Sequence, residues 1–445
     1  MKNNFKSAKP HQPQTGLQAT GGQQQVEINL NSKNDKIETK LVRLPITLIV
    51  FFYLRPWEML PFLSVLHPSA VLTIGTTAWV LLSANVDRKQ LFACPTTRWV
   101  IALTVGLAAS IPLTMYPGLN GLQNFMTPLS IFLALTAVVR SKKTLIYCLC
   151  TLLFCMDCHA VSVSHTYFTG NYTDRVTGFV GGEFIGANSL GAFFVMTLPI
   201  AWYLWSELRN KTGRIFALLS LVILLLAILS TQSRGGMIGL GVLIVLSICL
   251  SRKKLKAALI FAAIIAATIP AISPEQLERY TFISVSQEEM DPSSASRIYA
   301  WEKGIKMFLD YPIAGVGIGQ FSMAFGKHYR GDDWGDKFGK SLGYNAFLRP
   351  HNIFIQSLAE TGGIGFLGFI MILVTSLRSA WQTIKNNNEY SFYAKCLIAS
   401  AVAYFTCMLF DHHAFSTPTF TLFALLVIPE IITIRASSKR FPSRF

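Results

Sequence analysis

Apolar runs long enough to cross a membrane recur along almost the whole of this chain. A run of about 18 or more apolar residues can span a hydrocarbon core roughly 30 Å thick as one helix. A helix suits that environment because its backbone hydrogen bonds are satisfied within the segment, without water. The sequence lacks the alternating strands of roughly ten residues that build an outer-membrane barrel. It therefore predicts an all-α protein with many transmembrane helices.

The balance of residue types excludes an ordinary soluble protein and argues against nucleic-acid binding. Charged residues make up only 14% of the chain, whereas a soluble protein carries roughly a quarter. The formal net charge is +16, but the lysines and arginines cluster between the apolar runs rather than along one face. Such clustering is a signal of membrane topology. We therefore expect membrane lipids, and no nucleic acid, among the partners.

The apolar runs predict about twelve transmembrane helices. The first is the weakest, because Arg55-Pro56-Trp57-Glu58 interrupts it. Proline disfavours a helical conformation in the residue before it, so we expect a short helix there, followed by an interfacial segment. The predicted spans are 44–66, 69–86, 98–115, 124–139, 144–162, 187–205, 214–231, 235–250, 256–272, 351–377, 391–410 and 416–434.

Basic residues alternate between loops as expected for a protein whose termini are both cytoplasmic. The opposite short loops, 116–123 and 411–416, contain no lysine or arginine. We expect a disordered cytoplasmic tail over residues 1–40 without a cleavable signal peptide, a transmembrane domain over 41–434 and a cytoplasmic tail over 435–445. The basic loops carry Arg88, Lys89, Arg98, Arg140, Lys142, Lys143, Arg209, Lys211, Arg214, Arg252, Lys253, Lys254, Lys256, Arg378 and Lys385.

One outward loop, residues 273–350, is far longer than the others. Loops beyond roughly 15 residues are usually functional or disordered. Its content of Trp, Tyr and Phe argues against disorder, and apolar stretches such as 301–309 indicate that it is partly helical. Long domains cross the membrane regardless of their charge, so its basic residues do not contradict the topology. The working surface of the protein is therefore expected on the outward side.

Three outward arginines are candidates for binding an anion. Arg234 lies at the tip of a tight hairpin between two apolar runs, where Gly235 and Gly236 would let a bulky anion approach the backbone. Arg175 and Arg297 lie in the two larger outward loops. Guanidinium binds phosphate oxygens in a bidentate manner and keeps its charge. The alternative for each is a solvated or snorkelling side chain. Arg279, Arg330 and Arg349 are interpreted as ordinary loop charges.

The candidate general base is His351, which follows Pro350 directly before a long apolar run. Proline suits the first turn of a helix, so His351 is expected at the outer mouth of a span. Imidazole can accept a proton at neutral pH; the alternative is a helix-start histidine bonded to a loop carbonyl. Glu360 is about two and a half turns further on and should point away from His351. Gly362 and its glycine neighbour suggest a bend or close helix packing.

Three further clusters are better explained without a cofactor or a metal. Cys155-Met-Asp-Cys158-His159 matches a haem-attachment pattern, but it lies in an apolar run where packing is the favoured interpretation. The acidic stretch 332–336 could bind a divalent cation, yet a solvated turn is favoured. Asp411-His412-His413 could bind metal, but adjacent residues diverge by about 100° on a helix, so a solvated helix end is favoured.

The ordered series of motifs over roughly residues 170–370 resembles the superfamily of O-antigen ligases and O-antigen polymerases, bacterial envelope glycosyltransferases. Any single motif is weak, whereas the series, with a large loop before the histidine, is fairly specific. The motifs are Arg175-Val-Thr-Gly178, Gly186-Ala-Asn-Ser189, Ser233-Arg-Gly-Gly236, Ser296-Arg297 with Trp301, Tyr311-Pro-Ile-Ala-Gly-Val-Gly317, Pro350-His351-Asn352 and Glu360-Thr-Gly-Gly363.

The resemblance implies a bacterial inner-membrane enzyme whose active site faces the periplasm. Such an enzyme takes a glycan from undecaprenyl pyrophosphate and passes it to an acceptor hydroxyl, with inversion and without a metal or cofactor. In the ligase the acceptor is a sugar of lipid A–core, and in the polymerase it is another lipid-linked repeat unit. By motif, Arg234 and Arg297 would hold the pyrophosphate, with Arg175 as a weaker third member. His351 would deprotonate or orient the acceptor hydroxyl.

The ligase is the favoured function, and three alternatives stay open. A polymerase shares the motif set. A protein O-oligosaccharyltransferase shares the same core, although such enzymes often have a further C-terminal region. A lipid or glycan transporter without chemistry is the alternative from another class. Transporters usually show paired repeats and ionisable groups near the membrane midplane, whereas the polar residues here concentrate on one side.

Overall fold

The computed structural model describes residues 40–172, 175–250, 254–255, 259, 292–343 and 347–440, and within these ranges the secondary structure is helical throughout, without strands. Eight helices are long and apolar enough to cross a membrane, and three shorter apolar helices accompany them. These eleven match eleven of the predicted spans, which confirms the all-α, multi-span architecture. The predicted span 256–272 and the tail 1–39 lie outside the described residues.

The helices of the bundle follow the predicted spans closely. The spanning candidates are α2 (Arg43–Leu54), α5 (Pro68–Leu82), α7 (Pro95–Ser110), α8 (Leu119–Val138), α9 (Lys142–Phe168), α10 (Ala187–Glu207), α11 (Lys211–Ser230), α12 (Arg234–Leu250), α18 (Ile353–Lys385), α19 (Ser391–Cys407) and α20 (Thr417–Arg440). The remaining described elements are α3 (Pro56–Met59), α4 (Pro61–Ser64), α6 (Arg88–Ala93), η1 (Ile111–Leu113), η2 (Gly182–Phe184), α15 (Pro292–Asp310), α16 (Phe321–Ala324), the π-helical η4 (Phe325–Tyr329), α17 (Trp334–Leu342) and η5 (Met408–Phe410).

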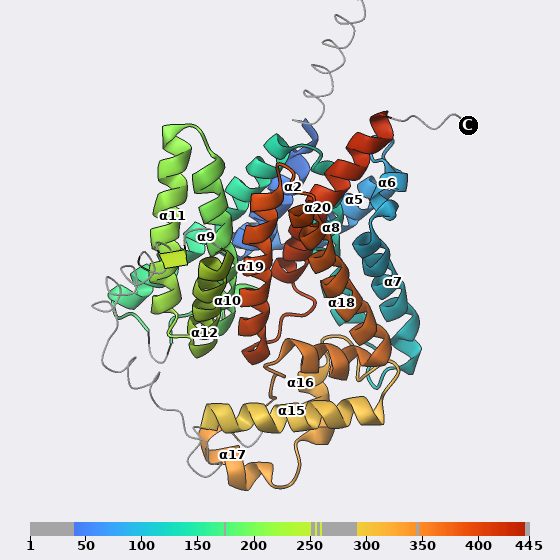
Figure 1. Ribbon diagram of the computed structural model, residues 1–445. Helices are drawn as coiled ribbons and strands as arrows, with labels where there is room; N and C mark the ends of the chain where they lie inside the picture. The colour runs from blue at the N-terminus through green and yellow to red at the C-terminus, as the bar shows by residue number, and fades with distance from the viewer. Residues whose placement is uncertain are drawn as a thin grey trace, which may run out of the picture.

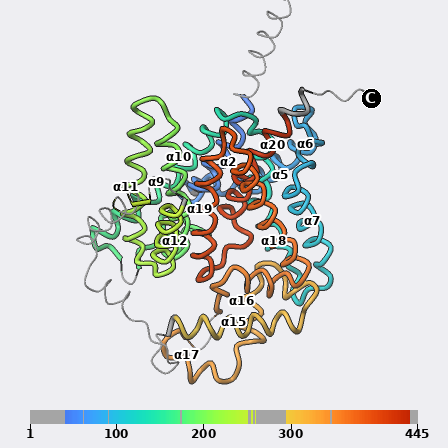
Figure 2. The backbone as a smooth tube through the Cα atoms, in the orientation of Figure 1, coloured from blue at the N-terminus to red at the C-terminus, as the bar shows by residue number. Residues whose placement is uncertain are grey.

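α10 is the most enclosed helix of the bundle, and it packs against α9, α11, α12 and α19. α20 packs against α8 and α18, and α18 packs against α7 and α15 (Figure 1). Figure 2 shows α15, α16 and α17 gathered at one end of the bundle, with the C-terminal end of α20 at the opposite end. The molecule therefore consists of a helical bundle and a smaller helical layer at one end of it.

The interruption predicted in the first span is present. α2 ends at Arg55, whose φ of 49° is left-handed, and Pro56 begins the next short turn. Arg55 pairs with Glu58 at 2.9 Å, and the Glu58 carboxylate also accepts a hydrogen bond from the backbone N–H of Gly181. This turn therefore anchors the loop between α9 and α10.

The Cys155-to-His159 pattern lies in the packed interior of the bundle, on α9. Cys155 and His159 are fully buried. The His159 imidazole forms a hydrogen bond of 2.9 Å with the carbonyl of Tyr53 and stacks on Phe184 at 4.8 Å. These contacts agree with the packing interpretation of the pattern.

α20 continues past residue 434, where the sequence placed the end of the last span. The guanidinium of Arg435 is buried and donates hydrogen bonds of 3.1–3.2 Å to the carbonyls of Thr136, Ala137 and Val139. Those carbonyls belong to the C-terminal end of α8, where a cation is favourable because the last carbonyls lack helical partners. Arg435 thus caps the C-terminal end of α8.

The layer formed by α15, α16 and α17 has its own aromatic core. Tyr299 packs against Phe325, Trp334 and Phe338, with ring centroids 5.6–6.2 Å apart. The Tyr299 hydroxyl donates to the Asp333 carboxylate at 2.8 Å, which ties α15 to the acidic stretch before α17. The described part of the long loop is therefore a folded helical layer, as its aromatic content predicted.

A glycine-rich segment of this layer, residues 312–319, enters the bundle through a break in α18. Gly362 has a φ of 59° and a ψ of −160°, so the helix is interrupted there. The break frees backbone groups, and the segment binds them through four hydrogen bonds of 2.7–3.2 Å. The pairs are Val316 N–H to Ala359, Gly317 N–H to Glu360, Gly363 N–H to Pro312 and Ile364 N–H to Ile313. The bend predicted at Gly362 is thus confirmed, and its role is to dock the layer.

Gly315→Ala is expected to destabilise the protein. Gly315 has a φ of 70°, and an added Cβ would lie 2.5 Å from the Glu360 carbonyl carbon. The left-handed backbone alone costs an alanine about 1–2 kcal/mol, and the clash adds to it. The matched control is Gly170→Ala, because Gly170 has a φ of 67° and open space around it. In detergent, thermal unfolding should begin at clearly lower temperature for Gly315→Ala than for Gly170→Ala, and equal midpoints would contradict the docking role.

Candidate functional site

Two short connections meet at the end of the bundle that carries α15: the residues before α18 and the link between η5 and α20. Asn352 joins them. Its side-chain oxygen accepts hydrogen bonds from the N–H groups of Phe354 and Ile355 at 2.9 and 3.1 Å, which caps α18. Its amide nitrogen donates to the carbonyl of Leu409 at 3.2 Å. This cap fixes the position of the neighbouring residue, His351, against the second connection.

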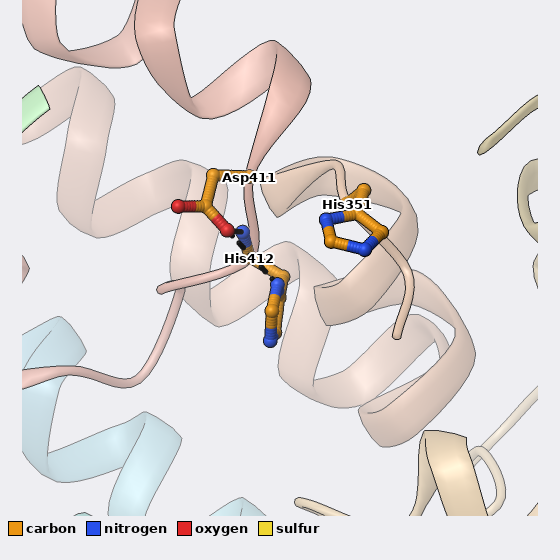
Figure 3. Close-up of side chains that lie close together, drawn as sticks. All are labelled: His351, Asp411 and His412. Carbon is orange, nitrogen blue, oxygen red and sulfur yellow. Dashed lines mark hydrogen bonds and ion pairs between the residues drawn. The ribbon is translucent and has the colours of Figure 1, made fainter. Parts of the chain in front are cut away.

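His351 lies two residues before the start of α18, outside the helix, whereas the sequence predicted that the span would begin at residue 351 with Pro350 in its first turn. Its φ of 44° is left-handed, a conformation that is uncommon for a residue other than glycine and that often occurs at functional sites. The His351 ring meets the edge of the His412 ring, with centroids 5.3 Å apart and planes at 83°. Figure 3 shows His351 and His412 side by side, with Asp411 on the left of this view.

Asp411 organises the second connection. One carboxylate oxygen lies 3.0 Å from Nδ1 of His412. The other accepts a hydrogen bond of 2.7 Å from the Ser189 hydroxyl and lies 3.6 Å from Nε2 of His413. The Asp411 side chain is only 5% exposed. A carboxylate that is removed from water in this way needs such partners, since an unpaired buried charge is costly.

The interpretation of Asp411-His412-His413 as a solvated helix end is wrong. Asp411 has an extended backbone (φ −147°, ψ 176°), because the helix ends at η5. The run therefore does not continue as a helix, and the rings of His412 and His413 stack, with centroids 5.2 Å apart. The carboxylate turns inward toward Ser189 at the start of α10, and His412 turns toward His351.

The electrostatics of the cluster separate its three histidines. Burial lowers the pKa of His351 to about 3, and the neighbouring His412, Arg297 and Arg349 add to that effect. His351 is therefore neutral at physiological pH, and its free ring nitrogen can accept a hydrogen bond. Burial also lowers the pKa of His412.

Asp411 and His413 form a charged pair. Burial alone would raise the pKa of Asp411, but His413 and His412 hold it well below its usual range. Burial alone would lower the pKa of His413, but the Asp411 carboxylate raises it above the usual value. The Asp411 carboxylate thus favours the protonated form of His413, whereas burial favours the neutral form of His351.

The Arg234 hairpin adjoins the cluster through α10. Ser233 donates to the Asn188 side chain at 2.9 Å, and the next residue, Ser189, is the one that binds Asp411. A Cβ on Gly235 would lie 3.5 Å from the side chain of Phe410, the residue that precedes Asp411 in the sequence. Arg234 is partly buried at the first position of α12. The N-terminus of this helix is therefore held next to the histidine cluster.

The other two predicted arginines lie on separate elements. Arg297 lies on α15, and its charge acts on His351. Arg175 is partly buried in the loop between α9 and α10, and Asp174 beside it lies outside the described residues. In that loop the Tyr172 hydroxyl accepts a hydrogen bond of 3.4 Å from Gln232 of the Arg234 hairpin. The structure therefore relates Arg297 to His351, and the Arg175 loop to the Arg234 hairpin.

Glu360 and Gln356 connect the docked layer to the histidine cluster. The Glu360 carboxylate accepts hydrogen bonds from the N–H groups of Gly319 and Phe321 at 3.0 and 3.4 Å. The Gln356 amide donates to Glu360 at 3.4 Å, and its oxygen accepts from the N–H of Ala414 at 2.9 Å. Glu360 thus organises the layer rather than orienting His351, as the helical spacing predicted. Gln356 carries that order to the 411–416 connection.

Gln356→Leu is expected to lower the rate of the reaction that this site performs by roughly tenfold, while the protein stays folded. Leucine keeps the volume but removes both hydrogen bonds, so the 411–416 connection loses its fixed distance from α18, and small displacements at an active site are costly. The control is Gln382→Leu, an exposed position on the same helix. Unchanged turnover in Gln356→Leu at normal abundance would show that the link has no positioning role.

The sequence did not single out Asp411, His412 or Ser189 as functional residues. Asp411 and Ser189 are 222 positions apart, so only the fold shows that they meet. The available signal was the run Asp411-His412-His413 at the end of an apolar segment, in a loop without lysine or arginine. That signal indicates a polar cluster but not its partners.

Comparison with known proteins finds a family match for part of this site. Residues 219–370 match the model of the O-antigen ligase family, a segment that contains Arg234, Arg297 and His351. A protein of Haemophilus influenzae described as uncharacterised is 23% identical over 241 residues, which cover 50% of this chain and 57% of that relative. The chain therefore aligns with little more than half of the relative's length. The family match confirms the resemblance carried by the motifs: residues 219–370 of this membrane-spanning chain are similar to the O-antigen ligase family, whose members are glycosyltransferase-like ligases.

Proposed function

We propose that this protein transfers a glycan from undecaprenyl pyrophosphate to a hydroxyl of a lipid A–core sugar, at the periplasmic face of the bacterial inner membrane. The observation that carries the proposal is the contact of the buried His351 with His412, beside Asp411 and within the field of Arg297. Of these residues, His351 and Arg297 lie in the segment that matches the O-antigen ligase family. A neutral base beside a site for an anionic leaving group is the minimum that this transfer needs.

In the proposed reaction His351 accepts the proton of the acceptor hydroxyl as its oxygen attacks the anomeric carbon. The new carbon–oxygen bond forms on the face opposite the pyrophosphate, so the configuration inverts. The bond from the anomeric carbon to the pyrophosphate oxygen breaks, and the electron pair leaves with the pyrophosphate. Arg234, Arg297 and Arg175 are proposed to stabilise that charge, since guanidinium matches phosphate geometry. The bound pyrophosphate also offsets the charge of Arg297, which raises the proton affinity of His351.

The position of the cluster supports the proposed sidedness. The basic connection between α10 and α11, which contains Arg209 and Lys211, lies at the opposite end of the bundle from α15 (Figure 1). Basic loops mark the cytoplasmic side. The histidine cluster and α15 are therefore proposed to face the periplasm, with both termini in the cytoplasm.

A reconstitution tests the proposal. Purified protein in liposomes is given an undecaprenyl-pyrophosphate-linked glycan and lipid A–core, with EDTA present, and the size of the acceptor is followed on a gel. A larger acceptor supports a metal-independent ligase. Longer lipid-linked chains from the donor alone would instead establish a polymerase. If neither product forms, the proposal fails, and protein acceptors or transport become the alternatives.

A further inference from the structure

The histidine cluster brings together three side chains that can ligate a metal. His351, Asp411 and His412 each offer one donor atom, and these atoms lie within 4.8 Å of one another. Two imidazoles and a carboxylate come from two separate connections, as Figure 3 shows. Donors of a tetrahedral zinc ion lie about 2.0–2.2 Å from the metal and so roughly 3.3 Å apart. The observed spacing extends beyond that value, so binding a zinc ion would require the three side chains to move closer together.

The donor set selects the kind of metal. Imidazole nitrogen favours zinc, copper or nickel, whereas magnesium and calcium prefer oxygen ligands only. Three protein ligands leave a position for water, the arrangement found in open zinc sites. Nδ1 of His351 is buried without a hydrogen-bond partner among the described residues, so a nitrogen that could bind a metal is not used within this part of the chain.

The surroundings hold the donors in place. Ser189 and His413 occupy the second oxygen of Asp411, and Asn352 fixes the backbone next to His351. Such outer contacts orient the ligands of metal sites and raise their affinity. The charges of Arg297 and Arg349 act on His351 and oppose a cation, so they lower the affinity of the site.

We propose that His351, Asp411 and His412 form a binding site for Zn²⁺, and that the transfer reaction does not require this metal. A zinc ion there would take the imidazole lone pair of His351. If His351 is the base of the proposed reaction, zinc occupancy inhibits transfer, and this consequence alone rests on the proposed function. The transfer would thus proceed in EDTA and stop in zinc.

The test measures binding directly, without either glycan substrate. Chelator-treated protein in detergent is titrated with ZnSO₄ by calorimetry, and with CoCl₂ while the visible absorption of bound Co²⁺ is recorded. We expect about one ion per chain. His351→Asn and His412→Ala should each weaken binding by about tenfold or more. His328→Ala is the matched control, because His328 is exposed and lies in the helical layer. Elution profiles and unfolding temperatures verify that the variants are folded.

The outcomes separate the two proposals. Saturable binding that the two cluster variants lose and His328→Ala keeps supports the site. No saturable binding, or equal affinity in all variants, overturns it. In the reconstitution, zinc should stop transfer and EDTA should restore it. If zinc binds without inhibiting transfer, the inference that it blocks His351 is wrong. A preparation that binds zinc but never transfers glycan refutes the proposed function and leaves the site standing.

Discussion

His351→Ala is expected to lower the rate of glycan transfer by roughly 10²- to 10⁴-fold, the range that general-base catalysis contributes. The imidazole is the group placed to accept the acceptor's proton, and alanine offers no replacement. His351→Asn should be equally inactive. Asparagine tolerates the left-handed backbone at this position better than alanine does, so this variant keeps the local conformation but lacks the base. Initial rates in the reconstitution measure both variants.

The control for His351 is His328→Ala, which removes an exposed imidazole from the helical layer. It should retain full activity. Membrane abundance and elution of each variant verify that the protein is intact. Full transfer by His351→Asn at normal abundance would remove His351 from the mechanism, and the transfer would then need another base.

Arg234→Ala is expected to reduce turnover by about 10²-fold, because one donor that stabilises developing charge is typically worth that much. Arg234→Lys should recover only part of the loss, since lysine keeps the charge but not the planar fork that binds two phosphate oxygens. The matched control is Arg209→Ala, an exposed arginine at the far end of α10. Rates measured against donor concentration distinguish weaker donor binding from slower chemistry.

If Arg234→Ala and Arg209→Ala lose the same amount of turnover, the rate depends on the overall charge of the protein rather than on the arginine of the hairpin. Full activity in Arg234→Ala would remove this arginine from the site. A lysine variant as active as the parent would favour a simple point charge over bidentate capture of the pyrophosphate.

The spans could be predicted from the sequence because hydrophobic length is a local property. Each apolar run identifies its own helix, and Arg55-Pro56 identifies its own interruption. The bend at Gly362 was predictable for the same reason, since two adjacent glycines weaken a helix wherever they occur. The role of the bend in docking residues 312–319 was not predictable. That segment comes from about 45 residues earlier and carries no complementary sequence signal.

The histidine cluster shows the opposite case, in which local reasoning failed. Asp411 lies next to an apolar helix. If that helix continued by one turn, the side chains of Asp411, His412 and His413 would point in different directions around it. The chain instead becomes extended, because Ser189 and two histidines can satisfy the carboxylate inside the protein. His351 and the three arginines were predicted from their residue types and order. Their mutual placement depends on contacts between distant segments.

The insertion of residues 312–319 into the break of α18 has a consequence for how such proteins can be recombined. The segment and the break exchange hydrogen bonds in both directions, so neither half is complete alone. A chimera that takes the helical layer from one homologue and α18 from another would join mismatched halves at the membrane surface. Crossovers placed before α15 and after α18 would transfer both together. Acceptor preference, if the layer determines it, would then move between proteins only as this larger unit.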